Sequence, residues 1–226
     1  ASPQCKVYSY AVGEQADFYA DNVRVENGEI WFDFYTPDTR YPLSNIRLGV
    51  PVMVNVENSV AAMAVAWLMG ATAEELRIGV ESFLGVRRRF DVHVNAPQVS
   101  YIDDYAHHPQ ELAATIQSVK TLYPDRYVIA VFQPHLYSRT RDFADDFARV
   151  LSEMDEVVLL PIYPAREEPI VGVTSEWLMG RLGDEVKKVL AEPNVVGKYL
   201  RLRLKQCLAK GQSVVVLTMG AGDIDQ

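Results

Sequence analysis

Two carboxylates, a tyrosine and two adjacent histidines occur within the segment Asp103-Asp104-Tyr105-Ala106-His107-His108-Pro109. An extended run, Val99-Ser100-Tyr101-Ile102, precedes it, and Pro109 begins a pattern of apolar residues at helical spacing. Proline is favoured in the first turn of a helix, where its missing N–H would have no partner. The polar segment is therefore expected between a strand and a helix, at the strand end where open α/β sheets bind ligands. The alternative is a solvated loop whose aspartates only cap the helix.

Polar or glycine-containing segments also follow three further predicted strands. They are Gln133 to Asp142, Pro161 to Glu168 and Met219 to Asp223. Because the carboxyl ends of parallel strands meet at one edge of a sheet, these segments and Asp103 to Pro109 are expected to converge. Four such loops at one edge favour a binding site over unrelated surface loops.

Arg139 is the strongest candidate for binding an anion. Arg139 and Arg141 lie near the predicted amino terminus of a helix. A cation there opposes the helix dipole, so two of them indicate an anionic ligand nearby. The alternative is pairing with Asp142 or Asp145 on a solvated face.

Three other motifs have a functional and a structural interpretation. His107 and His108 could bind zinc, but no cysteine accompanies them and adjacent histidines rarely share one metal, so we expect hydrogen-bonding or substrate-orienting roles and no metal site. Gly220-Ala221-Gly222 resembles a phosphate-binding turn but is too short to be specific. The run Arg87 to Arg89 is either a solvated face or a basic hinge that reaches a nucleotide phosphate.

The composition argues against several classes of function. The net charge of −8 argues against nucleic acid as the main partner, because binding to a phosphate backbone needs a basic surface. Cys5 and Cys207 are far apart and lack metal-type spacing, which is typical of a protein from a reducing cytoplasm. No apolar run approaches membrane-spanning length, so we expect no membrane insertion.

Two regions of different organisation are predicted. In residues 1–86, Asn27-Gly28 between alternating apolar residues predicts a β-hairpin. Two helices should follow, one from about Asn58 to Gly70 and one from a capping box at Thr72 to about Gly85. Residues 87–226 instead alternate strands and helices, which predicts a doubly wound, mostly parallel sheet. The predicted strands lie near 98–103, 127–133, 156–162, 186–191 and 213–218, and the helices near 109–122, 140–153, 175–182 and 194–209.

The order of motifs along the chain resembles that of the Mur ligases of peptidoglycan synthesis. The motifs are Asn55-Val56-Glu57-Asn58, Gly85 to Phe90, Asp103 to Pro109, Gln133 to Asp142 and Gly220 to Asp223. The Asp-Asp-Tyr-x-His-His-Pro and Pro-His-x-x-Ser-Arg-Thr-Arg patterns are similar to the branch that joins L-alanine to UDP-N-acetylmuramate. The murein-peptide recycling branch, which usually lacks the Ser-Arg-Thr-Arg run, is the alternative.

The resemblance implies an α/β fold and a three-domain ligase of which this chain is a part. Residues 1–86 would be the C-terminal part of the central ATP-binding domain, and residues 87–226 a Rossmann-like domain that binds the amino acid and ATP. No Gly-x-x-x-x-Gly-Lys-Ser/Thr stretch occurs, so the phosphate loop and the Mg²⁺ ligands are expected outside this chain. The chain by itself is therefore expected to be inactive.

The same resemblance implies a cytoplasmic enzyme that uses ATP, L-alanine and UDP-N-acetylmuramate. ATP would convert the muramoyl carboxylate to an acyl phosphate, which the amine of L-alanine then attacks. A non-catalytic module that binds a nucleotide or a carboxylate is the alternative from another class of protein.

Residue roles follow from matching this sequence to the family motifs. Asn55 and Asn58 would lie at the adenine, Arg89 would reach a nucleotide phosphate, and Asp104 would hold ATP through its ribose. One departure affects this part of the site: Val54 stands where relatives often have a histidine.

The amino-acid pocket would be formed by Tyr105, His107 and Arg139, with His108 as a weaker candidate. Arg139 would pair with the alanine carboxylate. Arg89, His107 and Arg139 are therefore the expected catalytic residues. Leu136 stands where relatives often have a second arginine, so carboxylate binding would depend on Arg139 alone or with Arg141.

Overall fold

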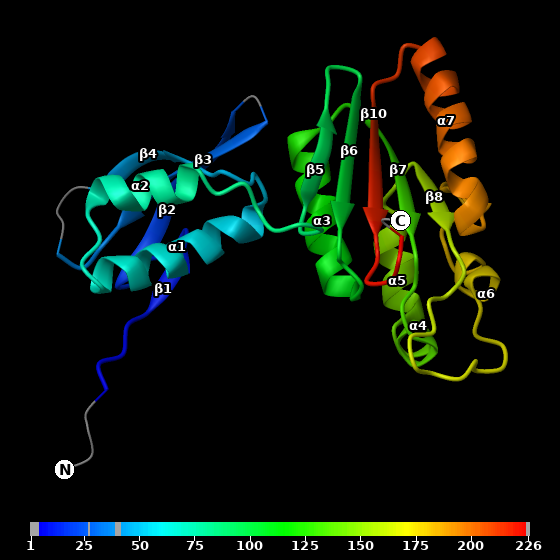
Figure 1. The fold of residues 1–226 in the computed structure, drawn as a ribbon, viewed down its shortest axis with the longest axis horizontal. Helices are drawn as coiled ribbons and strands as arrows, with labels where there is room; N and C mark the ends of the chain where they lie inside the picture. The colour runs from blue at the N-terminus through cyan, green and yellow to red at the C-terminus, as the bar shows by residue number, and fades with distance from the viewer. Residues whose placement is uncertain (1–4, 27, 39–41, 225–226) are drawn as a thin grey trace. The chain divides into compact units, whose positions relative to one another are not determined.

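The chain folds into two compact units, Ala1–Gly85 and Val86–Gln226, shown in Figure 1. The computed structural model describes residues 5–26, 28–38 and 42–224. No helix in these ranges is long and apolar enough to cross a membrane.

The first unit is a four-stranded sheet covered by two helices. The strands, in the sheet order β1-β2-β3-β4, are β1 (Tyr10–Val12), β2 (Phe18–Glu26), β3 (Glu29–Tyr35) and β4 (Leu43–Arg47). Strands β2 and β3 form the predicted hairpin, with Glu26 paired to Glu29. Gly28 has the positive φ of 78° that a tight turn requires, whereas Asn27 lies outside the described residues.

Helices α1 (Met53–Leu68) and α2 (Ala73–Glu81) bury one face each against this sheet. The core combines Phe18, Phe32 and Phe34 with Val60 of α1 and Leu76 of α2. The predicted capping box is present, since Thr72 and Glu75 exchange hydrogen bonds at the start of α2.

Helix α1 begins at Met53, earlier than the predicted start near Asn58. No side chain caps its first turn, so the usual sequence signal for a helix start is missing. Val56 and Val60 are both fully buried, so the apolar face begins before Asn58. Packing on the sheet therefore sets the start of this helix.

The second unit is a six-stranded sheet in the order β5-β6-β10-β7-β8-β9. The strands are β5 (Asp91–Asn95), β6 (Val99–Asp104), β7 (Tyr127–Phe132), β8 (Glu156–Leu159), β9 (Lys187–Leu190) and β10 (Val214–Met219). All neighbouring pairs are parallel except β5 with β6. Strand β10 is last in sequence but lies between β6 and β7.

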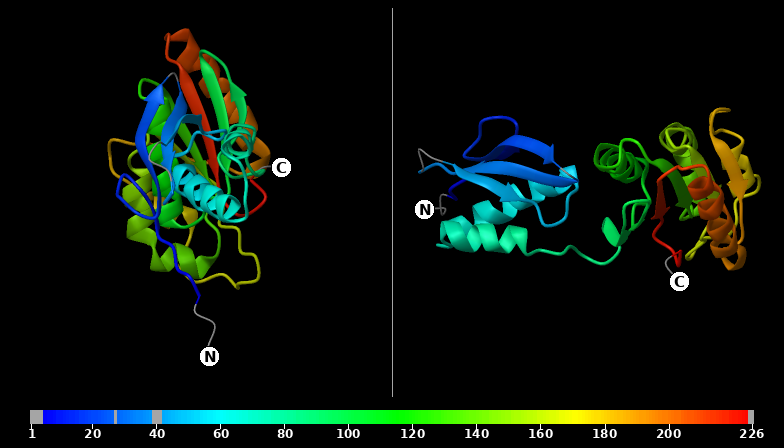
Figure 2. Two further views of the ribbon diagram at one scale, coloured as in Figure 1. Left: turned by 90° about the vertical axis from the view of Figure 1, so that its left-hand side faces the viewer. Right: turned by 90° about the horizontal axis from the view of Figure 1, so that it is seen from above.

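Helices cover both faces of this sheet, as a doubly wound fold requires (Figure 2). They are α3 (Pro109–Leu122), α4 (Tyr137–Asp142), α5 (Ala144–Leu151), α6 (Ser175–Met179) and α7 (Pro193–Ala209). Helix α7 packs on Ile129 and Val131 of β7. The next residue, Phe132, points to the other face and contacts Phe147 of α5, with ring centroids 5.3 Å apart.

Three details of this unit differ from the sequence prediction. The sequence pattern does not predict strand β5, which is a short, exposed edge strand with an irregularity between Val92 and Val94. The predicted helix 140–153 is two helices, because α4 begins at Tyr137 and the chain leaves helical geometry at Phe143. Strand β8 ends at Leu159 instead of 162, two residues before Pro161, which cannot donate a ladder hydrogen bond.

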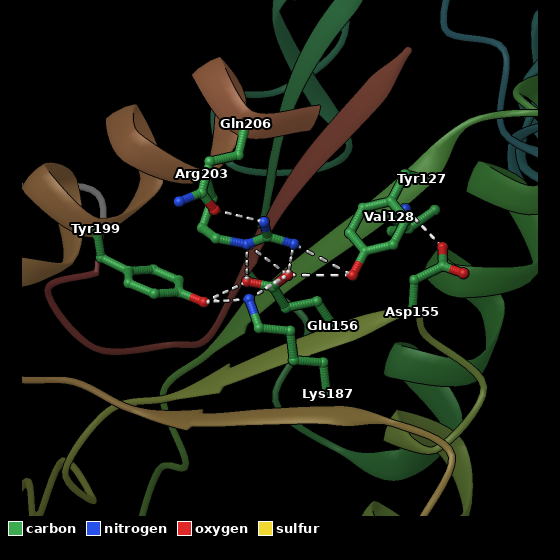
Figure 3. Close-up of polar contacts among 8 residues, drawn as sticks. All are labelled: Tyr127, Val128, Asp155, Glu156, Lys187, Tyr199, Arg203 and Gln206. Atoms are coloured by element: carbon green, nitrogen blue, oxygen red, sulfur yellow. Dashed lines mark hydrogen bonds and ion pairs between the residues drawn. The ribbon is translucent and has the colours of Figure 1, made fainter. Parts of the chain in front are cut away.

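A buried polar network fastens α7 to the sheet (Figure 3). Glu156 at the start of β8 is fully buried and accepts hydrogen bonds from Arg203 and Tyr199 of α7, Lys187 of β9 and Tyr127 of β7. Burial raises the pKa of Glu156, but these hydrogen bonds outweigh it and hold the pKa below the ordinary value. Burial also raises the pKa of Tyr127 to about 12.

Candidate functional site

The four polar loops singled out in the sequence leave the same edge of the second sheet. Strands β6, β10, β7 and β8 are consecutive and parallel, so their carboxyl ends lie side by side (Figure 1). Backbone hydrogen bonds continue past the strand ends: Gly220 N donates to Asp104 O (3.2 Å), and Leu136 N donates to Tyr163 O (2.9 Å). The loops therefore converge as expected.

Arg88 ties the ends of β6 and β10 together. Its Nε donates to the fully buried carboxylate of Asp103 (3.2 Å). Its Nη1 and Nη2 donate to the carbonyl oxygens of Gly222 (2.9 Å) and Gly220 (2.7 Å). The backbone of Arg88 has a positive φ of 61°, so these contacts hold it in a conformation that non-glycine residues rarely adopt. Three consecutive arginines are evident in the sequence, but no signal there marks this one as structural.

Arg89 points a second guanidinium at the same loop and stays accessible. It is exposed, and its guanidinium lies 5.2 Å from the centroid of the Tyr105 ring, as does that of Arg88. Its charge also lowers the pKa of Asp104, though less than the hydrogen bonds from Thr115 and Ala106 do. Of these two arginines, Arg89 is the more exposed to solvent.

Asp104 is a buried carboxylate that fixes the loop to α3. Its Oδ2 accepts from Thr115 Oγ1 (2.8 Å) and its Oδ1 from the Ala106 backbone N–H (3.0 Å). Burial raises its pKa, against the lowering effect of these hydrogen bonds. Both oxygens are thus already used within the protein, and a ribose contact would have to use their remaining lone pairs.

The two adjacent histidines have different surroundings. His108 caps α3, since its Nδ1 accepts from the Gln110 N–H (3.4 Å). His107 lies with its Nδ1 2.9 Å from Tyr105 O and 3.3 Å from a Glu111 carboxylate oxygen. Its ring faces the loop after β7, with the centroid 6.1 Å from that of His135. His107 is therefore placed to line a site, and His108 is mainly a helix cap.

The loop after β7 carries unpaired polar atoms. In the part of the chain that the structure describes, the buried side-chain atoms without a hydrogen-bond partner are Gln133 Oε1, His135 Nδ1 and Arg139 Nη1. Leu136, between them, has a positive φ of 73°. Buried unpaired groups and strained backbone are both destabilising, and they concentrate at functional sites.

Neighbouring loops hold this segment in place. Ser138 donates to Glu167 from both its backbone N–H and its hydroxyl, which joins the start of α4 to the loop after β8. His135 stacks on Tyr163 of the same loop, with ring centroids 5.5 Å apart and an interplanar angle of 12°. Arg139 is the third residue of α4, and this helix has only six residues, so the dipole argument made from the sequence has little force.

Asn55 and Asn58 belong to the first unit. Both lie in the first turns of α1, where Asn58 Nδ2 donates to Asn55 Oδ1 (3.1 Å) and Asn55 Nδ2 donates to Val50 O (3.4 Å). Their side chains are hydrogen-bonded polar groups at the start of a helix.

The described residues do not provide an evident magnesium site. No group of three or more histidine, cysteine, aspartate or glutamate side chains within residues 5–26, 28–38 and 42–224 is arranged to hold a metal ion.

Comparison with protein families matches residues 88–222 to the Mur ligase, glutamate ligase domain. The chain belongs to the Mur ligase family. This confirms the resemblance found in the sequence motifs. Within the matched region lie Arg88, the three unpaired polar atoms and the four converging loops up to Gly222.

Two curated relatives in this family are UDP-N-acetylmuramate–L-alanine ligases. The one from Parabacteroides distasonis is 51% identical over 221 residues, which are 98% of this chain and 46% of the relative. The one from Phocaeicola vulgatus is 48% identical over 220 residues, which are 97% of this chain and 46% of the relative. The chain thus spans about half the length of the curated relatives it matches.

A solved Mur ligase structure has the same fold. The UDP-N-acetylmuramate-alanine ligase from Thermotoga maritima superposes with a TM-score of 0.76 at 24% identity, over 96% of this chain and 45% of that one. The predicted α/β class with a Rossmann-like second unit is confirmed.

Proposed function

We propose that this chain is part of an ATP-dependent ligase that joins L-alanine to UDP-N-acetylmuramate in peptidoglycan synthesis. The observation that carries the proposal is Arg139 Nη1, a buried cationic donor without a partner, at the edge where the four loops meet. A carboxylate is the natural complement of such a donor. The curated relatives, named for L-alanine as a substrate, support the choice of amino acid.

The two units take the roles that the family resemblance suggests. The first unit is the C-terminal part of the central ATP-binding domain, with Asn55 and Asn58 at the adenine side. The second unit binds the amino acid and contributes to ATP binding. Because the chain lacks a phosphate loop, it does not catalyse the reaction alone. We expect the complete enzyme in the cytoplasm, where UDP-sugars and ATP are available.

The reaction forms an amide in two steps. An oxygen of the muramoyl carboxylate attacks the terminal phosphorus of ATP, which gives an acyl phosphate and releases ADP. The lone pair of the neutral L-alanine amine attacks the acyl carbon, the C–O bond to phosphate breaks, and phosphate leaves while the nitrogen gives up one proton to solvent. In this chain Arg139 fixes the alanine carboxylate, while Tyr105 and His107 line the pocket.

Charge stabilisation by this chain comes from Arg89. Its exposed guanidinium beside Tyr105 stabilises negative charge on a nucleotide phosphate. Asp104 holds the loop that carries Tyr105 and His107, and its remaining lone pairs are available to the ribose.

Replacing Arg139 tests the carboxylate contact. In the complete ligase, Arg139→Ala should raise the KM for L-alanine much more than that for ATP, because a buried charge-assisted pair contributes roughly 2–4 kcal/mol. Steady-state kinetics with each substrate varied in turn would measure this.

Arg149→Ala is the control. Arg149 lies on the next helix, α5, and is exposed and paired with Asp146 at 3.2 Å, so its loss should leave both KM values nearly unchanged. Unaltered alanine kinetics in Arg139→Ala, or a ligase that accepts a peptide but not L-alanine, would contradict the proposal.

A further inference from the structure

The three unpaired atoms after β7 differ in hydrogen-bonding character. Arg139 Nη1 can only donate, and Gln133 Oε1 can only accept. His135 Nδ1 accepts when the ring proton is on Nε2. One cationic donor and two acceptors, within seven consecutive residues, have the hydrogen-bonding character that binding a carboxylate together with an amino group requires.

The amide of Gln133 is held in one orientation. The residue is only 4% exposed, and its Nε2 donates to Asp223 Oδ1 (3.0 Å), so Oε1 is the atom left over. Its backbone N–H donates to Met219 O (3.0 Å), which anchors the residue to the end of β10. A side chain at position 222 would overlap Oε1, so Gly222 is required for this arrangement.

The imidazole of His135 is held in place and uncharged. It lies flat on Tyr163 and meets the edge of His107. Burial lowers the pKa of His135, and the charge of Arg139 lowers it further, which favours the neutral ring. A neutral ring has a lone pair to offer to an N–H donor.

We propose that Gln133 Oε1 and His135 Nδ1 bind the amino group of the amino acid whose carboxylate pairs with Arg139. This inference depends on the proposed function and adds the residues that hold the nucleophile. When the two N–H groups of the neutral amine donate to these acceptors, its lone pair is left for attack on the acyl carbon. The sequence motifs by themselves assign no role to His135 or to Gln133.

Three small carboxylates test the subsite on this chain as it exists. L-alanine, L-lactate and propionate share a carboxylate but carry an amino group, a hydroxyl group or neither. Calorimetric or NMR titration should find L-alanine bound at least about tenfold more tightly than propionate, with lactate between them. Arg139→Ala should weaken the binding of all three.

The outcomes separate this inference from the proposed function. Equal affinities for L-alanine and propionate, both dependent on Arg139, would overturn the amino subsite and leave the carboxylate contact standing. Binding of none of the three, up to their solubility limits, would overturn both.

Two variants test which side chains bind the amino group of L-alanine. His135→Phe keeps the stack on Tyr163 and removes Nδ1, and Gln133→Met removes the amide acceptor at similar volume. Each should lower the affinity for L-alanine and leave that for propionate unchanged, so propionate binding also reports that the site is folded. His93→Phe is the control, since His93 stacks on Tyr101 at the edge strand β5 and should change neither affinity.

NMR of the unmodified chain tests the role of His135 even if a variant does not fold. In the unmodified chain, the imidazole nitrogen resonances of His135 can be followed in long-range ¹H–¹⁵N spectra. L-alanine should shift the Nδ1 resonance towards that of a hydrogen-bonded acceptor, and propionate should not. The same shift with both ligands, or with neither, would overturn the role of His135.

Discussion

Arg88 and Arg89 are neighbours in the chain, but their guanidinium groups have different surroundings. Arg88 bonds Asp103 and the carbonyl oxygens of Gly220 and Gly222, whereas Arg89 lies exposed over the Tyr105 ring. Because their chemistry is identical, nothing in the sequence separates them. The distinction arises because Arg88 has positive φ, which turns its side chain towards the strand ends.

Removing Arg88 should destabilise the second unit strongly. Asp103 is fully buried, so Arg88→Ala leaves a buried charge without its main cationic partner, at a cost of about 3–5 kcal/mol in the free energy of unfolding. Chemical denaturation would measure this. In the double variant Arg88→Ala/Asp103→Asn the loss should be smaller than the sum of the single losses.

The control for this experiment is Arg166→Ala on the loop after β8, whose side chain is exposed. It should change stability by less than about 0.5 kcal/mol. If Arg88→Ala is no more destabilising than this control, Arg88 does not hold the strand ends together.

At the scale of elements, the sequence predicts that the polar loops converge at one edge of the sheet. It does not predict which polar atoms in those loops lack a hydrogen-bond partner. Strict alternation of strands and helices in the sequence is enough to predict Asp104, His107 and Arg139 at one edge. The unpaired atoms of Gln133 and His135 could not be foreseen, since they depend on which partners other loops fail to supply. Strand β5 and the break at Phe143 were also missed, because an exposed edge strand and a mid-helix interruption carry little periodic signal.

The Glu156 network could not be predicted because its members are far apart in sequence. Its partner Arg203 is 47 residues away, and a glutamate at the start of an apolar strand looks like an ordinary exposed end. The network fixes α7 to the sheet at the amino end of β8, because Glu156 is the first residue of this strand. The polar loops follow the carboxyl ends of the strands and so lie at the opposite end of the sheet.

The hydrogen-bond network around Glu156 should make the free energy of unfolding depend on pH. The pKa of Glu156 is lowered in the folded protein, so its contribution is complete above the ordinary value of 4.5 and is lost as the pH falls through the lower, folded pKa. We expect Glu156→Gln to cost about 3–5 kcal/mol at neutral pH, because Arg203 and Lys187 lose their charged partner.

Denaturation curves of both proteins at several pH values would check this. The difference in stability between them should shrink below pH 4.5, where Glu156 takes up its proton. Glu153→Gln is the control, since its exposed ion pair with Lys120 should contribute little at any pH. A difference that stays constant down to the acid transition would show that the charge of Glu156 is not what stabilises α7.

At the scale of the whole molecule, the two units have separate cores. The apolar cluster of the first unit consists of residues before Gly85, and the cluster under α7 consists of residues after Val86. Each core is built within its own unit, so neither sheet needs the other unit to be complete.

We therefore expect residues 86–226 to fold when expressed alone. The fragment should unfold cooperatively and bind L-alanine with the affinity of the longer chain, because Gln133, His135 and Arg139 all lie within it. Thermal unfolding and the same titrations would check both points. An aggregated fragment, or a folded one that ignores L-alanine, would show that the first unit takes part in forming the site.

The central position of β10 affects how this unit can assemble during synthesis. Strands β6 and β7 are made early, yet neither pairs with the other, since β10 separates them. Until the ribosome has released residues 214–219, both strands present a bare edge to their surroundings, which invites mispairing. We therefore expect the sheet edge that carries the four polar loops to form late, when β10 pairs with both β6 and β7.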